Sequence, residues 1–327
     1  MDNHPISCYH LGHYFQVDGK QLQEQYKEHI SDYSSWGQKE HADQWMVFDR
    51  NLSPRLSIDE TALSNGELYT IVTNKEARGR KGAIVAMIKG TVAEDIITVL
   101  KKIPERLRKR VQEVTMDMAA NMQLAIRRCF VNAHRVIDRF HVQKLAYDAV
   151  QEVRIKYRWE ALDAENEAIE KAKKNGTAYK PEILTNGDTL KQLLARSRYL
   201  LFKHHSKWTA VQRQGAELLF ERYDKLKYAY HIALNLGEIF KVCRSKEQAF
   251  KRLALWYNQV EECGIDPFKT VAGSIQAHYL SILNFFINRS TNASAESFNA
   301  KVKAFRATSR GVRDVKFFLF RLSKIYA

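Results

Sequence analysis

Between residues 55 and 137, short runs of β-forming residues follow one another, separated first by turns and then by helical stretches. Residues 56–60, 67–73 and 82–88 are apolar or rich in β-branched side chains, and short polar segments lie between them. Three such runs in close succession predict an antiparallel meander. This local order constrains the fold more than any other feature of the chain, because strands linked by short turns pair with one another.

The meander is followed by alternating helices and strands. Thr91 is a candidate N-cap for a helix that carries Ile96, Ile97 and Leu100 and ends before Pro104. Residues 111–116 form a further strand pattern that ends at Asp117, and residues 121–129 have helical periodicity. Val136 and Ile137 form a short fifth strand that ends at Asp138. The order β-β-β-α-β-α-β is that of the RNase H core, a mixed sheet.

From His141 onward the apolar periodicity is helical, with one polar break over residues 171–187. A further helix starts near Asn292 or Ser294 and runs to about Phe305, and a last one carries Val312, Val315, Leu319 and Leu322. The expected fold class is therefore α/β: an RNase H-like mixed sheet with a large all-helical insertion before the last core helices. The uninterrupted helical patterns cover residues 190–202, 210–240, 246–263 and 268–288.

We divide the chain into four expected parts. Residues 1–50 are an N-terminal appendage with one helical stretch near residues 21–40, and they would bind DNA or a partner chain. Residues 51–145 form the first part of the core, residues 146–290 the helical insertion, and residues 291–327 the returning core helices. An insertion of roughly 150 residues is itself of domain size.

Composition narrows the class of protein. The 327 residues include 52 Lys and Arg against 37 Asp and Glu, a net charge of +15, with 45% hydrophobic residues. A disordered chain would have fewer apolar residues, and the positive excess favours nucleic acid as partner. Four well-separated cysteines form no Cys-x-x-Cys motif, which predicts a reducing compartment. We see neither an apolar run long enough for a membrane span nor a signal peptide, so a cytoplasmic protein is expected.

Three acidic residues occupy positions where this fold would bring them together. Asp59 ends the first strand pattern, Asp117 ends the fourth, and Glu296 lies in the first turn of the late helix. Three converging carboxylates repel one another unless cations neutralise them, and oxygen ligands suit Mg²⁺ or Mn²⁺. Each acid alone is more simply a turn residue, or a charge that complements a helix dipole. Asp138 is an alternative to Asp117, whereas Glu60 would point to the opposite face of its strand.

The motifs around these acids resemble those of a known family. Residues 57–60 (SIDE), 114–118 (VTMDM), 136–142 (VIDRFHV) and 292–299 (NASAESFN) look like the corresponding segments of DDE transposases of bacterial insertion sequences, closest to the ISL-three type. The resemblance covers about residues 55–327 in order. It implies an RNase H-like catalytic domain with a helical insertion before the catalytic Glu.

The resemblance also implies roles for individual residues. Asp59, Asp117 and Glu296 match the catalytic, metal-binding triad, and Asp138 with His141 resembles the Cys/Asp-x-x-His signature of related transposases. The implied cofactor is Mg²⁺, two ions per site, with Mn²⁺ as a substitute. The implied activity is cleavage at insertion-sequence ends followed by transfer of the 3′-OH into target DNA. The implied partners are the element ends, target DNA and further copies of the chain on DNA, in a nucleoid-associated protein.

The N-terminus departs from the family pattern. Such transposases usually begin with a zinc-binding segment and a helix-turn-helix, but only one Cys lies among the first 55 residues. End recognition would then lie in a separate polypeptide, or the chain is a truncated or divergent member.

Basic residues near the acids are candidates for contacts with the DNA backbone. One set follows Glu296 along the late helix, and a second forms the densest basic run of the chain. Solvated surface charge is the simpler interpretation of both sets. The candidate DNA-binding residues are Asn299, Lys301, Lys303, Arg306 and Arg310, together with Lys101, Lys102, Arg106, Arg108, Lys109 and Arg110.

Two other functions are compatible with the same residues. An RNase H-like nuclease would hydrolyse DNA without joining it, and strand transfer separates the two activities. A DNA-binding protein that has lost catalysis is the third hypothesis, and the three intact acids argue against it.

Overall fold

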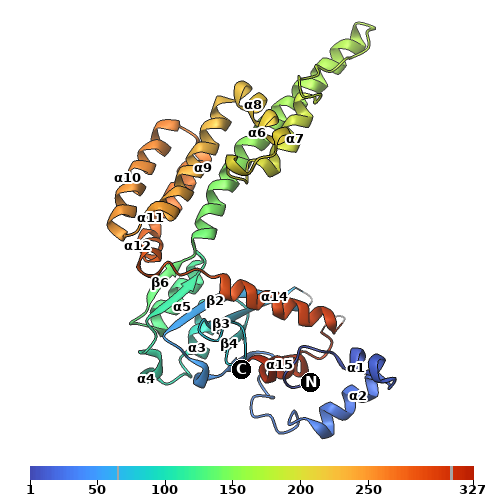
Figure 1. Ribbon diagram of the computed structural model, residues 1–327, viewed down its shortest axis with the longest axis vertical. Coiled ribbons are helices and arrows are strands. Elements are labelled where there is room, and N and C mark those ends of the chain that lie inside the picture. The colour runs from blue at the N-terminus through green and yellow to red at the C-terminus, as the bar shows by residue number, and fades with distance from the viewer. Residues whose placement is uncertain (65, 310–311) are drawn as a thin grey trace. The chain divides into compact units, whose positions relative to one another are not determined.

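The computed structural model describes residues 1–64, 66–309 and 312–327, and it divides into two compact units (Figure 1). The first unit contains residues 1–138 and 288–327, and the second contains residues 139–287. The first unit is thus built from two separate stretches of sequence. No helix in the described stretches is long and apolar enough to cross a membrane.

A mixed sheet of six strands forms the centre of the first unit, in the order β1-β4-β3-β2-β5-β6. β2 (Arg55–Ser64), β3 (Glu67–Asn74) and β4 (Ile84–Lys89) form the expected antiparallel meander. β5 (Glu113–Met116) pairs in parallel with β2, and β6 (His134–Ile137) pairs in parallel with β5. This is the RNase H-like arrangement, so the predicted fold class is confirmed.

The sheet has one strand that the sequence analysis missed. β1 (Trp45–Val47) pairs antiparallel with β4 at the edge of the sheet. Three residues are too few to show a period of two, so this strand leaves no pattern in the sequence. A 3-10 turn, η2 (Asp49–Asn51), connects β1 to the strand that carries Asp59.

One face of the sheet is covered by α3 (Ala93–Leu100), α4 (Glu105–Arg108) and α5 (Ala120–Cys129) (Figure 1). Alternate residues of β2, Leu56 and Ile58, are fully buried there against Ile96, Leu100 and Ile126. Because side chains alternate across a strand, Ser57, Asp59 and Thr61 point to the opposite face.

The opposite face is covered by α14 (Ala293–Thr308) and α15 (Val315–Tyr326). Phe298, Val302 and Phe305 of α14 lie one helical turn apart and are buried against Ile71 and Met87 of the sheet. This apolar row fixes which side of α14 contacts the sheet, and it therefore also orients the polar residues between its members.

The N-terminal segment packs on α15 within the first unit. α1 (Cys8–Phe15) and α2 (Gly19–Gln25) continue into a short π-helical turn, η1 (Tyr26–Ile30). Tyr26 and Tyr33 contact the aromatic rings of Phe317 and Phe320. The expected helix near residues 21–40 was too long: it ends at Ile30, and turns follow because Ser31 is extended.

All the regular secondary structure described in the second unit is helical. Two predicted continuous helices are broken. Residues 210–240 bend at Tyr223 (φ −132°), and residues 268–288 break at His278 (φ −120°), because neither residue has a helical backbone conformation. The elements are α6 (Arg139–Lys174), α7 (Leu190–Leu200), η3 (His205–Lys207), α8 (Ala210–Arg222), α9 (Asp224–Val242), α10 (Lys246–Cys263), α11 (Asp266–Ala277), α12 (Tyr279–Leu283) and α13 (Phe285–Asn288).

Candidate active site

Asp59 lies in the middle of β2 on the face covered by α14. Its Oδ2 accepts a hydrogen bond of 2.8 Å from Nδ2 of Asn299, which is one helical turn beyond Glu296. Its Oδ1 accepts from the amide of Glu60 at 2.9 Å. Asn299 also donates to the Glu60 carbonyl at 3.2 Å, so a single amide ties α14 to the strand at Asp59.

Asp117 directly follows β5, the parallel neighbour of β2. The observed pairing ends with Ser57 opposite Thr115, and two further residues along each chain give Asp59 and Asp117. Residues in register on parallel strands point to the same face, so this register, continued past the end of β5, would place Asp117 on the same face as Asp59. The Asp117 Oδ1 also accepts from the Ala119 amide at 2.8 Å, which fixes the turn into α5.

Glu60 is close enough to both aspartates for their charges to affect its pKa. Burial raises the pKa of the Glu60 carboxyl, and the neighbouring charges of Asp117 and Asp59 raise it further, while a hydrogen bond with Asn121 opposes the shift. Both aspartates are therefore within electrostatic reach of the same group. The sequence predicts that Glu60 points to the face of β2 opposite Asp59, and its hydrogen bond with Asn121 of α5 agrees with this. The charges of both aspartates nevertheless affect the pKa of Glu60.

The start of α14 lies against the sheet through Asn292, which is fully buried. Its Nδ2 donates to the Ile58 carbonyl at 3.3 Å, and its Oδ1 accepts from the Thr115 hydroxyl at 3.2 Å. The amide of Glu296 donates to the Asn292 carbonyl at 3.1 Å. Glu296 is exposed in the first turn of α14. Asn292, the residue just before this helix, is held between β2 and β5.

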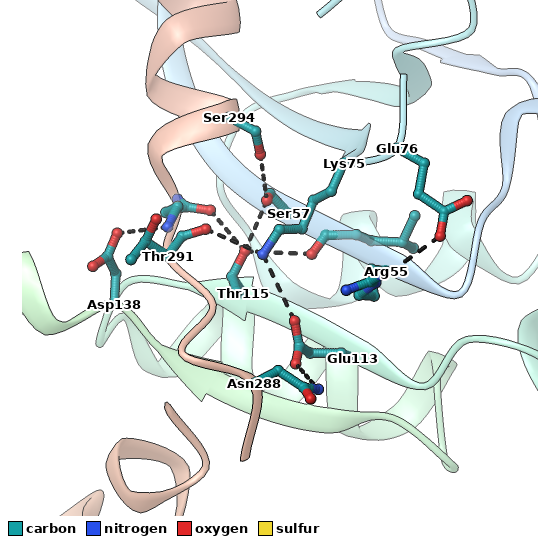
Figure 2. A network of polar contacts seen from close by, with 12 residues as sticks. Arg55, Ser57, Lys75, Glu76, Glu113, Thr115, Asp138, Asn288, Thr291 and Ser294 are labelled. Atoms are coloured by element: carbon teal, nitrogen blue, oxygen red, sulfur yellow. Dashed lines mark hydrogen bonds and ion pairs between the residues drawn. The ribbon is translucent and has the colours of Figure 1, made fainter. Parts of the chain in front are cut away.

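Asp138 follows β6 and is fully buried. Its Oδ2 accepts a hydrogen bond of 2.6 Å from the Asn292 amide, immediately before α14 (Figure 2). The charge of Asp138 thus contacts the backbone at the start of the helix that carries Glu296. His141, the other member of the predicted signature, lies in the first turn of α6 in the second unit.

The donor set at this face suits a hard cation. Carboxylate oxygens are the ligands that Mg²⁺ and Mn²⁺ prefer in proteins. Within the described ranges, no three His, Cys, Asp or Glu side chains form a cluster that could hold a metal ion. Asp59 and Asp117 each lie two residues beyond the last observed pair of β2 and β5, and in the described residues they form no such cluster with Glu296.

The predicted DNA-binding residues of α14 have different surroundings. Asn299 is 6% exposed, Lys301 donates to the Gly79 carbonyl at 2.7 Å, and Arg306 donates to the carbonyls of Ala62 and Leu63. Lys303 is exposed, and Arg310 lies outside the described residues.

The second predicted basic set surrounds α4. Arg108 donates to the carbonyls of Ile103 and Cys129 and is partly buried. The remaining members of this set are exposed: Lys101, Lys102, Arg106, Lys109 and Arg110.

A third basic segment was missed in the sequence. The loop between β3 and β4 contains Lys75, Arg78, Arg80 and Lys81, and the Lys301 amine reaches its Gly79 carbonyl. With Arg55 and Ser290, Lys75 and Arg78 line an open cavity of about 350 Å³. The run of cations was visible in the sequence, but its place beside α14 depends on the fold.

The fold and these residues define a class of protein: an RNase H-like core with acidic residues on neighbouring strands and a further acid on a helix that packs against them. A family model described as Transposase, of the DDE ISL-three (ISL3) type, matches residues 56–322. The chain therefore belongs to this DDE transposase family, as the sequence motifs predicted.

A curated relative supports this assignment. The chain is similar to the transposase for insertion sequence element IS1001 of Bordetella parapertussis, with 22% identity over 270 residues. The match covers 82% of this chain and 59% of that relative, so the chain spans less than two thirds of its length.

Proposed function

We propose that this protein is an active DDE transposase that cuts DNA at the ends of an insertion sequence and joins the resulting 3′-OH to target DNA. The observation that carries the proposal is the parallel pairing of β2 with β5 as far as Ser57 and Thr115, two residues before Asp59 and Asp117, with α14 tied to Asp59 through Asn299. Membership of the transposase family gives this geometry its chemical interpretation.

In this proposal, Asp59, Asp117 and Glu296 hold the divalent cations. A bound pair of Mg²⁺ ions, or Mn²⁺ in their place, supplies Lewis-acid chemistry that activates the attacking oxygen and stabilises the leaving oxygen of a phosphodiester. Asp59 is held by Asn299, so its carboxylate is oriented before cations bind. Glu296 is exposed on the first turn of α14, and in this proposal its carboxylate completes the set when cations bind.

Asp117 is our choice for the second ligand. Its carboxylate follows the strand next to Asp59 and is partly exposed, whereas Asp138 is fully buried and accepts from the Asn292 amide. A ligand for a cation that also contacts DNA must reach the surface, which favours Asp117. Asp138 is then an auxiliary residue, with His141.

The exposed cations are proposed to hold the DNA backbone. Lys303 extends beyond Glu296 on α14, and the cations around α4 form a second basic surface. Phosphate contacts of this kind position DNA without reading its sequence. Lys301 supports this surface by holding the β3–β4 loop at Gly79, and Arg306 by holding the end of β2 at Ala62 and Leu63. The partners would be the element ends, target DNA, further copies of this chain and a separate end-recognition polypeptide.

A labelled-DNA assay tests the proposal. The DNA carries the ends that flank the gene, and the reaction contains Mg²⁺ or Mn²⁺ and any partner encoded beside it. We expect nicks at the 3′ ends and joined products, both abolished by Asp59→Asn. Hydrolysis without joining would instead support the nuclease, and binding without either reaction would indicate a protein that has lost catalysis.

A further inference from the structure

The segment immediately before α14 is attached to the sheet by a chain of polar contacts (Figure 2). Asn288 Nδ2 donates to the carboxylate of Glu113 on β5 at 2.9 Å. The other oxygen of Glu113 lies 3.7 Å from the amine of Lys75, at the end of β3. Lys75 in turn donates to the Thr291 carbonyl at 3.1 Å. Two side chains of the sheet thus hold both ends of residues 288–291.

The two charged side chains of this network are mostly buried. Glu113 is 2% exposed, and the Lys75 side chain is 16% exposed. Burial lowers the pKa of Lys75, and the nearby charges of Glu113 and Asp138 oppose this shift. Removing one partner would leave the other charge uncompensated in a mostly buried place, which is destabilising. The restraint on residues 288–291 comes from the hydrogen bonds that Glu113 and Lys75 make with Asn288 and Thr291.

A second attachment follows at the helix itself. α14 has no side-chain N-cap, and the amide of Asn292 is satisfied by the buried Asp138 instead. Asn292 is in turn held by Ile58 and Thr115, while Ser294 shares a 3.2 Å hydrogen bond with Ser57. Glu296 lies only four residues after Asn292, a rise of about 6 Å along a helix. A shift of Asn292 would therefore also move Glu296.

We infer that Lys75, Glu113 and Asp138 are positioning residues, which set the place of Glu296 relative to Asp59 and Asp117 by fixing the residues that start α14. This inference rests on the proposed function for its catalytic consequence, but its structural consequence can be measured without catalysis. None of the three residues needs to touch DNA or a cation to play this role.

The test compares single variants at each attachment. Asp138→Ala removes the acceptor for the Asn292 amide, whereas Asp138→Asn keeps one. Lys75→Met removes the cation that holds Thr291, and Asn288→Ala removes an exposed donor to Glu113 with little risk to folding. The control is the half-exposed ion pair of Glu67 and Lys89, which joins β3 to β4, changed to Glu67→Gln and Lys89→Met.

Two readouts are needed. Hydrogen exchange followed by mass spectrometry measures the protection of amides 293–299 in the full chain, without DNA or cation. Cleavage of labelled end DNA is measured over a series of Mg²⁺ concentrations, with DNA affinity determined separately. If cleavage falls only because the variant is less stable overall, exchange should increase across the whole sheet, and the Mg²⁺ dependence of cleavage should not change.

We expect exchange at 293–299 to accelerate about tenfold or more in Asp138→Ala and Lys75→Met, and to a smaller extent in Asn288→Ala. Cleavage should fall about a hundredfold in Asp138→Ala, with a higher Mg²⁺ requirement and unchanged DNA affinity, since small misplacements of a catalytic group are this costly. Asp138→Asn should stay within about tenfold of the unmodified protein, and the controls should match it.

The inference is overturned if the folded variants show unchanged exchange at 293–299. It is also overturned if Asp138→Asn is as inactive as Asp138→Ala with normal exchange, because that pattern identifies a cation ligand. If Asp138→Ala does not fold, Asn288→Ala and Lys75→Met decide by the same exchange criterion. If the unmodified protein cuts no DNA, the proposed function fails, and exchange still decides whether these residues position α14.

Discussion

Replacing Asn299 by Ala should slow DNA cleavage by removing the group that orients Asp59. The Asn299 amide donates at 2.8 Å to the Asp59 carboxylate and at 3.2 Å to the Glu60 carbonyl, and the residue is 6% exposed, so water does not easily replace it. Hydrogen bonds to charged groups contribute about 1.5–3 kcal/mol. If this energy serves to hold Asp59 in its reactive orientation, its loss slows cleavage by about 10- to 150-fold.

The assay is single-turnover cleavage of labelled end DNA by Asn299→Ala under saturating Mg²⁺. Urea unfolding of the same variant measures the accompanying loss of stability, which should be about 1.5–3 kcal/mol. Asn235→Ala, which removes an exposed amide bonded to Gln259, is the matched control and should change neither quantity. A cleavage rate within about twofold of the unmodified protein, while Asp59→Asn is inactive, would refute the reasoning.

Three further predictions concern charge and packing. Glu60→Gln should raise the midpoint of thermal unfolding near neutral pH, because the pKa of Glu60 is raised in the folded protein and its ionised form is therefore destabilising. This gain in the midpoint should shrink as the pH falls through the raised pKa towards the ordinary value of 4.5. A gain that is independent of pH would contradict this reasoning. Arg321→Leu should make the N-terminal segment more sensitive to limited proteolysis, because the guanidinium donates to the carbonyls of Met1, His4 and Ile6; an unchanged cleavage pattern would refute the attachment. Lys303→Ala should weaken DNA binding equally for all sequences and lower the salt dependence by about one contact, as measured by fluorescence anisotropy at several salt concentrations; a sequence-selective loss would show that Lys303 contacts bases.

Much of the catalytic core could be predicted because its signals are local. β2, β3 and β4 are close in sequence and β-rich, and Asp59 and Asp117 sit at positions that strand order alone assigns to neighbouring strands. β1 could not be predicted, since its three residues gain their strand conformation only by pairing with β4. The helix expected near residues 21–40 was too long, because Tyr26 and Tyr33 both pack on α15 although only Tyr26 is helical. Tyr26 lies in η1, and Tyr33 lies in the bends that follow it.

The polar residues behind the candidate site could not be predicted for a different reason. Lys75 and Glu113 are separated by one strand and two helices in the sequence, and Asn292 is almost 180 residues beyond Thr115 (292 − 115 = 177). Their partners are defined only once the sheet and α14 have formed. Asn299 was interpreted as a DNA contact because it lies on a basic helix, whereas the apolar row Phe298, Val302 and Phe305 turns it towards Asp59.

The central claim is that Asp59, Asp117 and Glu296 hold the same divalent cations. Iron-directed cleavage tests it most directly: Fe²⁺ replaces Mg²⁺, and the hydroxyl radicals that it generates with ascorbate and peroxide cut the nearby backbone. We expect cuts adjacent to residues 59, 117 and 296, suppressed by excess Mg²⁺ and absent in Asp59→Asn. Cuts elsewhere in the chain, or cuts at these positions that neither Mg²⁺ nor Asp59→Asn removes, would contradict the account.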